Sequence, residues 1–198
     1  DLQILTSRAG SASTAQYRVR DNQYSTTIDY GCNQSSIITN WQVLAGESAT
    51  ERYFQNDIIG DEDGGYVVVY ENKNVSSNTL FIRCKEVDGQ NNVTTSIVAN
   101  LGVTVSLFRS QGKPSIVRMP DKSLLCFVSI VDDDKANFNA YRSTDNGNNW
   151  NIVAKQILNE EIDVSASKYN IERVSSGYAH GQILMIISAY SSSGSDTK

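Results

Sequence analysis

The eight residues Ser143-Thr144-Asp145-Asn146-Gly147-Asn148-Asn149-Trp150 decide how the rest of this chain is interpreted. Their pattern is S-x-D-x-G-x-x-W, which at this composition arises by chance in roughly one sequence in a thousand of this length. Gly147 allows a positive φ angle without steric cost, and the Ser143 and Asp145 side chains can accept hydrogen bonds from nearby backbone N–H groups. Trp150 then begins the next strand and covers the turn with its ring. The stretch therefore predicts a tight β-hairpin.

Three apolar runs recur at a regular spacing along the chain. They are Tyr66–Tyr70, Leu124–Val128 and Ile183–Ile187, and their first residues are 58 and 59 positions apart. A polar turn and a shorter apolar segment precede each run. A continuous apolar run is typical of a strand that is covered on both faces. Repeated β-units that cannot bury both faces alone stack on one another, which predicts a repeat architecture such as a β-propeller.

The composition is that of a folded β-protein. Hydrophobic residues make up 39% of the chain and charged residues 20%, which is too apolar for disorder. The 17 Lys and Arg residues are scattered and the net charge is −5, so we expect no nucleic-acid partner. No apolar run reaches the length of a membrane span, and no N-terminal stretch resembles a signal peptide, although the chain begins at Asp1 rather than at Met.

The cysteines and the histidine exclude several kinds of site. Cys32, Cys84 and Cys126 lie far apart, without the paired spacing of a zinc ribbon or a disulfide scaffold. Cys84 and Cys126 fall in strand-like segments, where buried free thiols are expected; one disulfide with an odd thiol left over is the alternative. His180 is the single histidine and is expected in an exposed turn, which argues against a Ser-His-Asp triad or a histidine metal site.

The eight-residue stretch and the repeat resemble the Asp-box β-propellers of the sialidase-like superfamily. In that family the box lies between the third and fourth strands of a blade, away from the catalytic face. The resemblance implies an all-β fold, an antiparallel β-propeller of Asp-box type, with about three blade equivalents in this chain. Ser143, Asp145, Gly147 and Trp150 then have a structural role. Because the family places a strand after the tryptophan, we expect strand and loop over 153–163 despite some helical character there.

The predicted units divide the whole chain. They are a partial blade over 1–50, a blade over 51–105, a blade with the Asp-box over 106–165 and a half blade over 166–198. Propellers have about four to eight blades. The chain is therefore expected either to be part of a longer polypeptide or to complete a ring with a second chain, because a half blade leaves an open sheet edge.

The resemblance makes Lys113 a candidate ligand-binding residue. In the family an Arg-Ile-Pro motif opens a blade, and its arginine binds the substrate carboxylate. Here Pro114 and the strand after it match the motif, but Lys113 stands where the arginine is expected. Lysine does not offer the bidentate contact that arginine makes with a carboxylate, so this departure counts against sialidase chemistry.

The run Asp132, Asp133 and Asp134 supplies the catalytic candidates. The resemblance implies that it occupies a place comparable with the family's acid/base aspartate, in a loop between two strands of one blade. A solvated surface turn is the plainest interpretation, and a calcium site that includes the Asn137 side chain is a third. No other metal or cofactor is expected. The family's tyrosine nucleophile, its glutamate partner and its other arginines have no match here.

Tyr178 and Tyr190, at the ends of the last predicted hairpin, are candidates for a ligand-binding surface because their rings can stack on sugars. Three functions then remain open, since one fold serves many. The first is a non-catalytic propeller that binds glycans or a protein partner on a cell, virion or fibre surface, which implies an extracellular location. The second is a sialidase-like glycoside hydrolase whose further catalytic residues lie outside this chain. The third is a structural propeller within a larger assembly.

Overall fold

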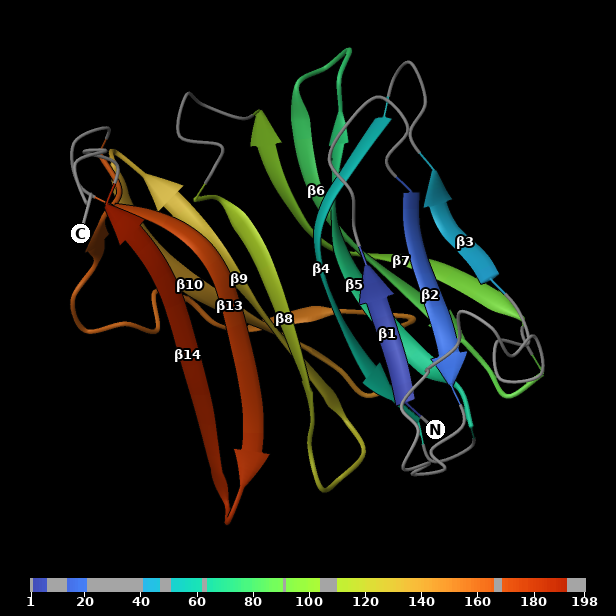
Figure 1. Cartoon of the computed structure of the whole chain (residues 1–198). Coiled ribbons are helices and arrows are strands. Elements are labelled where there is room, and N and C mark those ends of the chain that lie inside the picture. Colours follow the sequence, from blue (N-terminus) through green and yellow to red (C-terminus); the bar gives the residue numbers. More distant parts are fainter. Residues whose placement is uncertain are drawn as a thin grey trace, which may run out of the picture.

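The computed structural model describes residues 2–6, 14–20, 41–46, 51–61, 64–90, 92–103, 110–165 and 169–191, with side chains between 55 and 190. Within these residues the protein is all-β and every sheet is antiparallel, as the sequence predicts. The sheets twist and curl as they follow one another across the molecule (Figure 1). Among the described residues, no helix is long and apolar enough to cross a lipid bilayer.

Two sheets come from the first half of the chain, and each keeps its strands in sequence order. The first has three strands, β1 (Leu2–Thr6), β2 (Thr14–Arg20) and β3 (Trp41–Gly46). The second has four strands, β4 (Glu51–Gly60), β5 (Tyr66–Asn74), β6 (Thr79–Val87) and β7 (Val93–Val103). Sequential order with short turns makes the second sheet a simple meander.

Two further sheets follow in the second half. The third contains β8 (Gly112–Arg118), β9 (Leu124–Asp132), β10 (Lys135–Ser143), β11 (Asn151–Ala154) and β12 (Ile162–Asp163). Here β8, β9, β10 and β11 again form a four-stranded meander, and β12 also pairs with β10. The last sheet is the hairpin of β13 (Tyr169–Ala179) and β14 (Gln182–Ser191). The segment 153–163 is thus strand and loop rather than helix, as expected. The division into blades remains a prediction.

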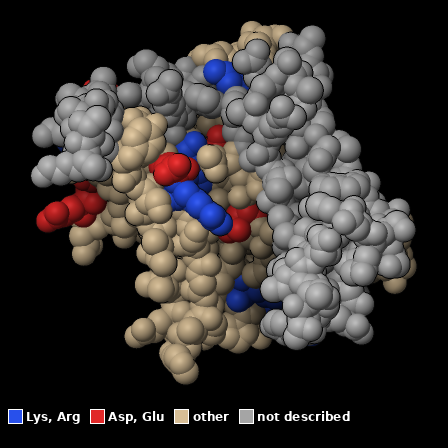
Figure 2. Space-filling model, in the orientation of Figure 1, with Lys and Arg blue, Asp and Glu red and all other residues tan. Residues whose placement is uncertain are grey.

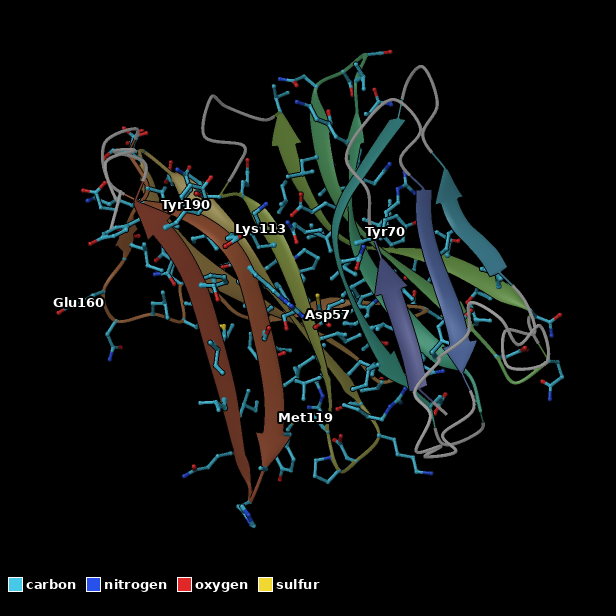
Figure 3. All side chains as sticks on the ribbon, in the orientation of Figure 1. Asp57, Tyr70, Lys113, Met119, Glu160 and Tyr190 are labelled. Atoms are coloured by element: carbon cyan, nitrogen blue, oxygen red, sulfur yellow. The ribbon has the colours of Figure 1, made fainter. Side chains whose placement is uncertain are left out.

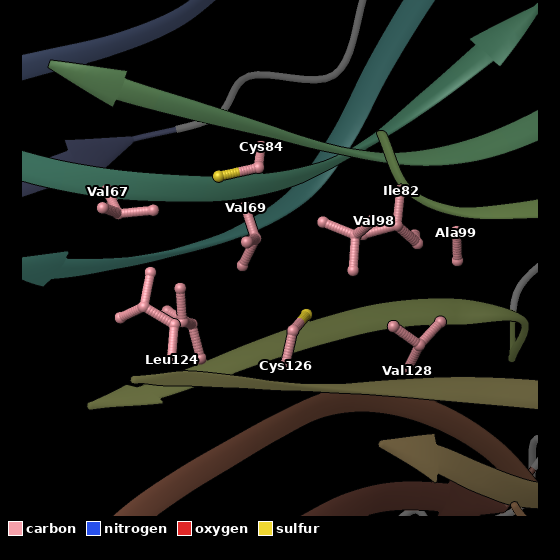
Figure 4. Packing of buried hydrophobic residues seen from close by; sticks show 10 residues of the cluster. Val67, Val69, Ile82, Cys84, Val98, Ala99, Leu124, Cys126 and Val128 are labelled. Atoms are coloured by element: carbon pink, nitrogen blue, oxygen red, sulfur yellow. The ribbon is translucent and has the colours of Figure 1, made fainter. Parts of the chain in front are cut away.

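The main hydrophobic core lies between the second and third sheets (Figure 4). Val67 and Val69 of β5 face Leu124, Cys126 and Val128 of β9 across this interface, and all five are at most 1% exposed. The opposite face of the third sheet packs on the β13–β14 hairpin in two further clusters. Strand β9 is therefore buried on both faces, which explains its unbroken apolar run.

The first strands of three successive sheets, β4, β8 and β13, lie side by side (Figure 1). Polar side chains join them where no β-ladder exists. The Asp57 carboxylate on β4 accepts hydrogen bonds from the Ser115 hydroxyl and the Ile116 N–H of β8, each at 3.0 Å. The Ser115 hydroxyl in turn lies 2.8 Å from that of Ser176 on β13. One carboxylate and two hydroxyls therefore link the first strands of three sheets.

Cys84 and Cys126 are buried free thiols, which confirms the sequence-based expectation for both. Burial raises the pKa of the Cys84 thiol to about 12 and holds that of Cys126 well above its ordinary value. Both thiols are therefore protonated at neutral pH and pack as small apolar side chains. Cys32 lies outside the described residues.

Candidate functional site

The Asp-box stretch folds into the turn between β10 and β11, and its own side chains fix its shape. The Ser143 hydroxyl donates to Asp145 Oδ1 at 2.7 Å and accepts the Gly147 N–H at 2.8 Å. The Asn149 side chain and N–H donate to the Asp145 carboxylate at 2.6 and 2.8 Å. These bonds, with that of Ser143, lower the pKa of Asp145 to about 2. The Trp150 indole donates to the Gly147 carbonyl at 2.9 Å.

This turn also joins the second and third sheets. Gly147 has a φ of +96°, and a Cβ at this position would lie 2.8 Å from the Cys84 sulfur. The Ser96 hydroxyl of β7 donates to the Gly147 carbonyl. The Asn146 amide donates to Asp61 at 2.9 Å and also to a carboxylate of β6. The contacts made by this stretch therefore hold two sheets together.

The aspartate run forms the hairpin between β9 and β10, at the other end of those strands. Asp133 and Asp134 have φ angles of 41° and 62°, as in a two-residue turn of the type that matches strand twist. Asp132 is the last residue of β9 and pairs across the ladder with Lys135. All three aspartates are exposed. Of the three, Asp132 borders a pocket beside β9 and β10.

That pocket has a volume of about 280 Å³, and all but one of the residues that line it are polar or charged. Its wall combines strands β9 and β10 with the segment that follows β11. Residues of the wall include Ile130, Asp132, Asn139, Lys155, Gln156 and Glu161. Because carboxylates, amides and ammonium groups share this small space, the pocket can both donate and accept hydrogen bonds.

Two asparagines on β10 hold in place the segment after β11, which forms one wall of the pocket. The Asn137 side chain donates to the Leu158 carbonyl at 3.1 Å and accepts the Leu158 N–H at 2.9 Å. The Asn139 side chain accepts the Gln156 N–H at 3.1 Å. Together with the backbone bond from the Ile157 N–H to the Phe138 carbonyl, at 3.0 Å, these side chains take the place of a regular β-ladder. They hold residues 155–158 beside β10 and thereby place Lys155 and Gln156 at the pocket.

The charges around the pocket are unevenly matched. Lys135 Nζ lies 3.0 Å from Asp163 Oδ2, and bonds from Ser165 and Lys135 lower the pKa of Asp163 to about 2. Within the part of the chain that the structure describes, no ion pair joins Asp132, Glu161 or Lys155 to another residue. Two carboxylates and one ammonium group are therefore available to a ligand.

Lys113 has a partner inside the protein. Its N–H and its ammonium group lie 2.9 and 3.4 Å from Glu71 Oε1, and it is only 8% exposed. Burial raises the pKa of the Glu71 carboxyl, and the charge of Lys113 offsets part of that rise. Lys113 lies on β8 in the middle of the face in Figure 3, where charged side chains of both signs gather in Figure 2. A role in ligand binding stays a prediction.

The other candidates lie apart from the pocket. Tyr178 is half-buried against the cluster of Val117, Leu125 and Phe127, near the β13–β14 turn. Tyr190 is 46% exposed at the far end of β14 (Figure 3). The structure does not bring these two tyrosines together.

A second, mainly apolar pocket of about 350 Å³ lies near the β8–β9 turn. It is lined by Met119, Pro120, Asp121, Leu125, Arg142 and Val153. The Arg142 guanidinium donates to the Asp121 carboxylate in its wall, so that charge is already matched. This pocket offers few polar groups to a hydrophilic ligand.

Sequence reasoning found Asp132 and missed its neighbours Lys155, Gln156 and Glu161. These three carry no motif, and the segment that contains them is held by side chains rather than by a periodic pattern. The alternation of Asn137 and Asn139 on one face of β10 was the available signal.

Among the described residues, no group of three or more His, Cys, Asp or Glu side chains is placed to hold a metal ion. The calcium site considered for the aspartate run therefore has no such group to form it. No protein-family model matches the chain, and no curated protein is similar to it.

Proposed function

We propose that the chain is part of an Asp-box β-propeller of the sialidase-like superfamily and acts as a non-catalytic module that binds a glycan. Two features support the propeller. The second sheet and strands β8 to β11 of the third are consecutive four-stranded meanders, and the first strands of three sheets lie side by side. In a propeller each blade is such a meander, and the first strands line the axis.

The polar pocket beside Asp132 is the observation that carries glycan binding. Its volume of about 280 Å³ is just below the usual range for small-molecule sites, and suits one sugar unit. A sugar hydroxyl both donates and accepts hydrogen bonds. The carboxylates of Asp132 and Glu161 accept from hydroxyls, and the Lys155 ammonium donates to them. Ile130 offers an apolar surface for the C–H groups of a sugar ring.

A glycoside hydrolase is the second candidate, and one observation favours it. Asp132 and Glu161 border the same pocket, and most glycoside hydrolases use a pair of carboxylates. The binding function is preferred because the tyrosine nucleophile has no match and Lys113 is engaged by Glu71. Release of a chromophore from aryl glycosides, lost in Asp132→Asn, would favour the hydrolase.

Binding to a glycan array, followed by calorimetry on the sugars that are bound, tests the proposal. Glu161→Gln removes a charged acceptor and is expected to weaken binding about tenfold or more, because hydrogen bonds to charged groups are the strong ones. Glu160→Gln is the matched control: Glu160 is exposed and points outward in Figure 3, and it does not border the pocket. If the protein binds no glycan, the proposal is wrong.

The ring requires partners as well as a ligand. The proposed blades would be completed by the rest of the same polypeptide or by a second chain, and a glycan-binding module belongs on an extracellular, cell or virion surface. Mass measurement in solution separates the two sources, since a monomer at all concentrations excludes a ring of two such chains.

A further inference from the structure

We propose that the pocket between β9, β10 and the segment after β11 selects uncharged sugars and rejects sugars that carry a carboxylate, such as sialic acid. The inference rests on the proposed glycan binding and adds its selectivity. Its basis is the placement of charges that are free to meet a ligand.

The two free carboxylates dominate the pocket. Asp132 closes β9 and Glu161 precedes β12, so the two approach the pocket from different segments. A sphere of 280 Å³ is roughly 8 Å across, which is about the Debye length at physiological ionic strength. A carboxylate bound in the pocket would therefore lie within about one Debye length of both Asp132 and Glu161, where salt screens the repulsion only in part.

The two lysines of the pocket do not outweigh the negative charge of its carboxylates. Lys135 borders the pocket, but its ammonium group is 3.0 Å from the Asp163 carboxylate, which already matches its charge. Lys155 is exposed and forms no ion pair with a described residue. One free ammonium group thus stands against two free carboxylates, and the local field opposes an incoming anion.

An uncharged sugar avoids this electrostatic repulsion and can still form hydrogen bonds with the same side chains. Each carboxylate can accept two hydroxyl hydrogen bonds, and these charge-assisted bonds are shorter and stronger than neutral ones. The Gln156 amide and the Lys155 ammonium supply donors for ring and hydroxyl oxygens. The wall that carries Gln156 is held by Asn139, which reduces the ordering that binding requires.

The experiment compares pairs of glycans that differ only in a terminal sialic acid, titrated into the wild-type chain at physiological and at 0.5 M salt, roughly a threefold increase. We expect the uncharged member of each pair to bind at least tenfold more tightly, and the difference to shrink at high salt. Asp132→Asn and Glu161→Gln each remove one negative charge, so each should reduce the difference in affinity between the uncharged and the sialylated member of a pair. Glu160→Gln should leave it unchanged, and circular dichroism confirms that each variant is folded.

The outcomes separate the inference from the proposed function. Equal or tighter binding of the sialylated members overturns the selectivity and leaves glycan binding intact. Binding that neither Asp132→Asn nor Glu161→Gln alters places the sugar elsewhere and also overturns the inference. Binding of neither member of any pair overturns the proposed function itself.

Discussion

Gly147 is the residue at which the turn between β10 and β11 meets the neighbouring sheet. Its φ of +96° lies in a region that side chains rarely adopt, and its Cα faces the Cys84 sulfur at close range. A larger residue here has to distort either the turn or the core. Backbone conformation and packing therefore require glycine at the same position.

Gly147→Ala is expected to lower the free energy of unfolding by about 2–3 kcal/mol, through backbone strain and overpacking together. Urea unfolding followed by fluorescence measures the change. Gly177→Ala is the matched control, since a Cβ there meets nothing within 4 Å. Equal effects of the two substitutions would contradict the role assigned to Gly147.

Asp145 makes the stability of the turn depend on pH. The Asn149 and Ser143 bonds lower its pKa from 3.8 to about 2 in the folded protein. The stabilisation is therefore present above about pH 4 and is lost as the pH falls toward 2. Asp145→Asn cannot titrate, so its stability should change less over this range than that of the wild type.

Thermal unfolding between pH 5 and 2 checks this expectation. Asp133→Asn serves as the control, because the Asp133 carboxylate accepts no hydrogen bond from the described residues. Parallel pH profiles for the wild type and Asp145→Asn would show that these bonds do not stabilise the fold.

The pattern S-x-D-x-G-x-x-W predicts much of this residue-scale detail, but not all of it. The hydroxyl, carboxylate and glycine act locally, so a short motif can specify them. Asn146 and Asn149 occupy positions that the motif leaves open. Asn146 bonds Asp61, which is far away in sequence, and only the packing of two sheets brings them together.

At the scale of elements, the segment after β11 shows how side chains can substitute for a ladder. Residues 155–158 do not form a strand, yet the Asn137 and Asn139 side chains and one backbone bond, from the Ile157 N–H to the Phe138 carbonyl, hold them beside β10. The wall of the pocket formed by this segment therefore depends largely on two side-chain amides.

Asn137→Ala is expected to lower stability by about 1–3 kcal/mol, because it leaves the Leu158 N–H and carbonyl without partners. It should also weaken glycan binding by loosening the wall. Hydrogen exchange at the Leu158 amide reports the change directly. Asn159→Ala, at an exposed neighbour, is the control and should leave that exchange rate unaltered.

Apolar runs predict strands well and irregular segments poorly. Strands β5 and β9 could be predicted because burial on both faces of a sheet demands apolar residues in succession. The apolar run of β14 also predicted a strand, but the expected cover on both faces is wrong there, because Leu184 and Ile186 are largely exposed. Segment 155–161 does not form a buried strand, so it needs no unbroken apolar run. Nothing in its sequence pattern therefore indicated that it lines a pocket. The site was therefore only partly predictable: Asp132 was accessible through a resemblance, whereas Glu161 needed the fold.

At the scale of the molecule, β14 presents an apolar face and an edge that no other described strand pairs with. Leu184 is 65% exposed and Ile186 is 58% exposed. Strand β14 pairs only with β13 among the described strands, whereas β5 and β9 each have neighbours on both sides. Exposed apolar edge strands favour association.

We expect the wild-type chain to associate as its concentration rises, and Leu184→Lys with Ile186→Lys to suppress that association, because charges on an edge strand oppose pairing. Light scattering coupled to size exclusion measures the mass. Gln182→Lys, near the β13–β14 turn, is the control and should associate like the wild type. A wild-type chain that stays monomeric throughout would contradict the expectation.

The thiols of Cys84 and Cys126 are natural probes of opening at the interface between the second and third sheets. Both are protonated and sealed in the core, so an alkylating reagent can reach them only when the sheets separate. The rate of modification at each cysteine, resolved by mass spectrometry, then records how often that interface opens. The opening of the interface between these two sheets can therefore be measured without any added label.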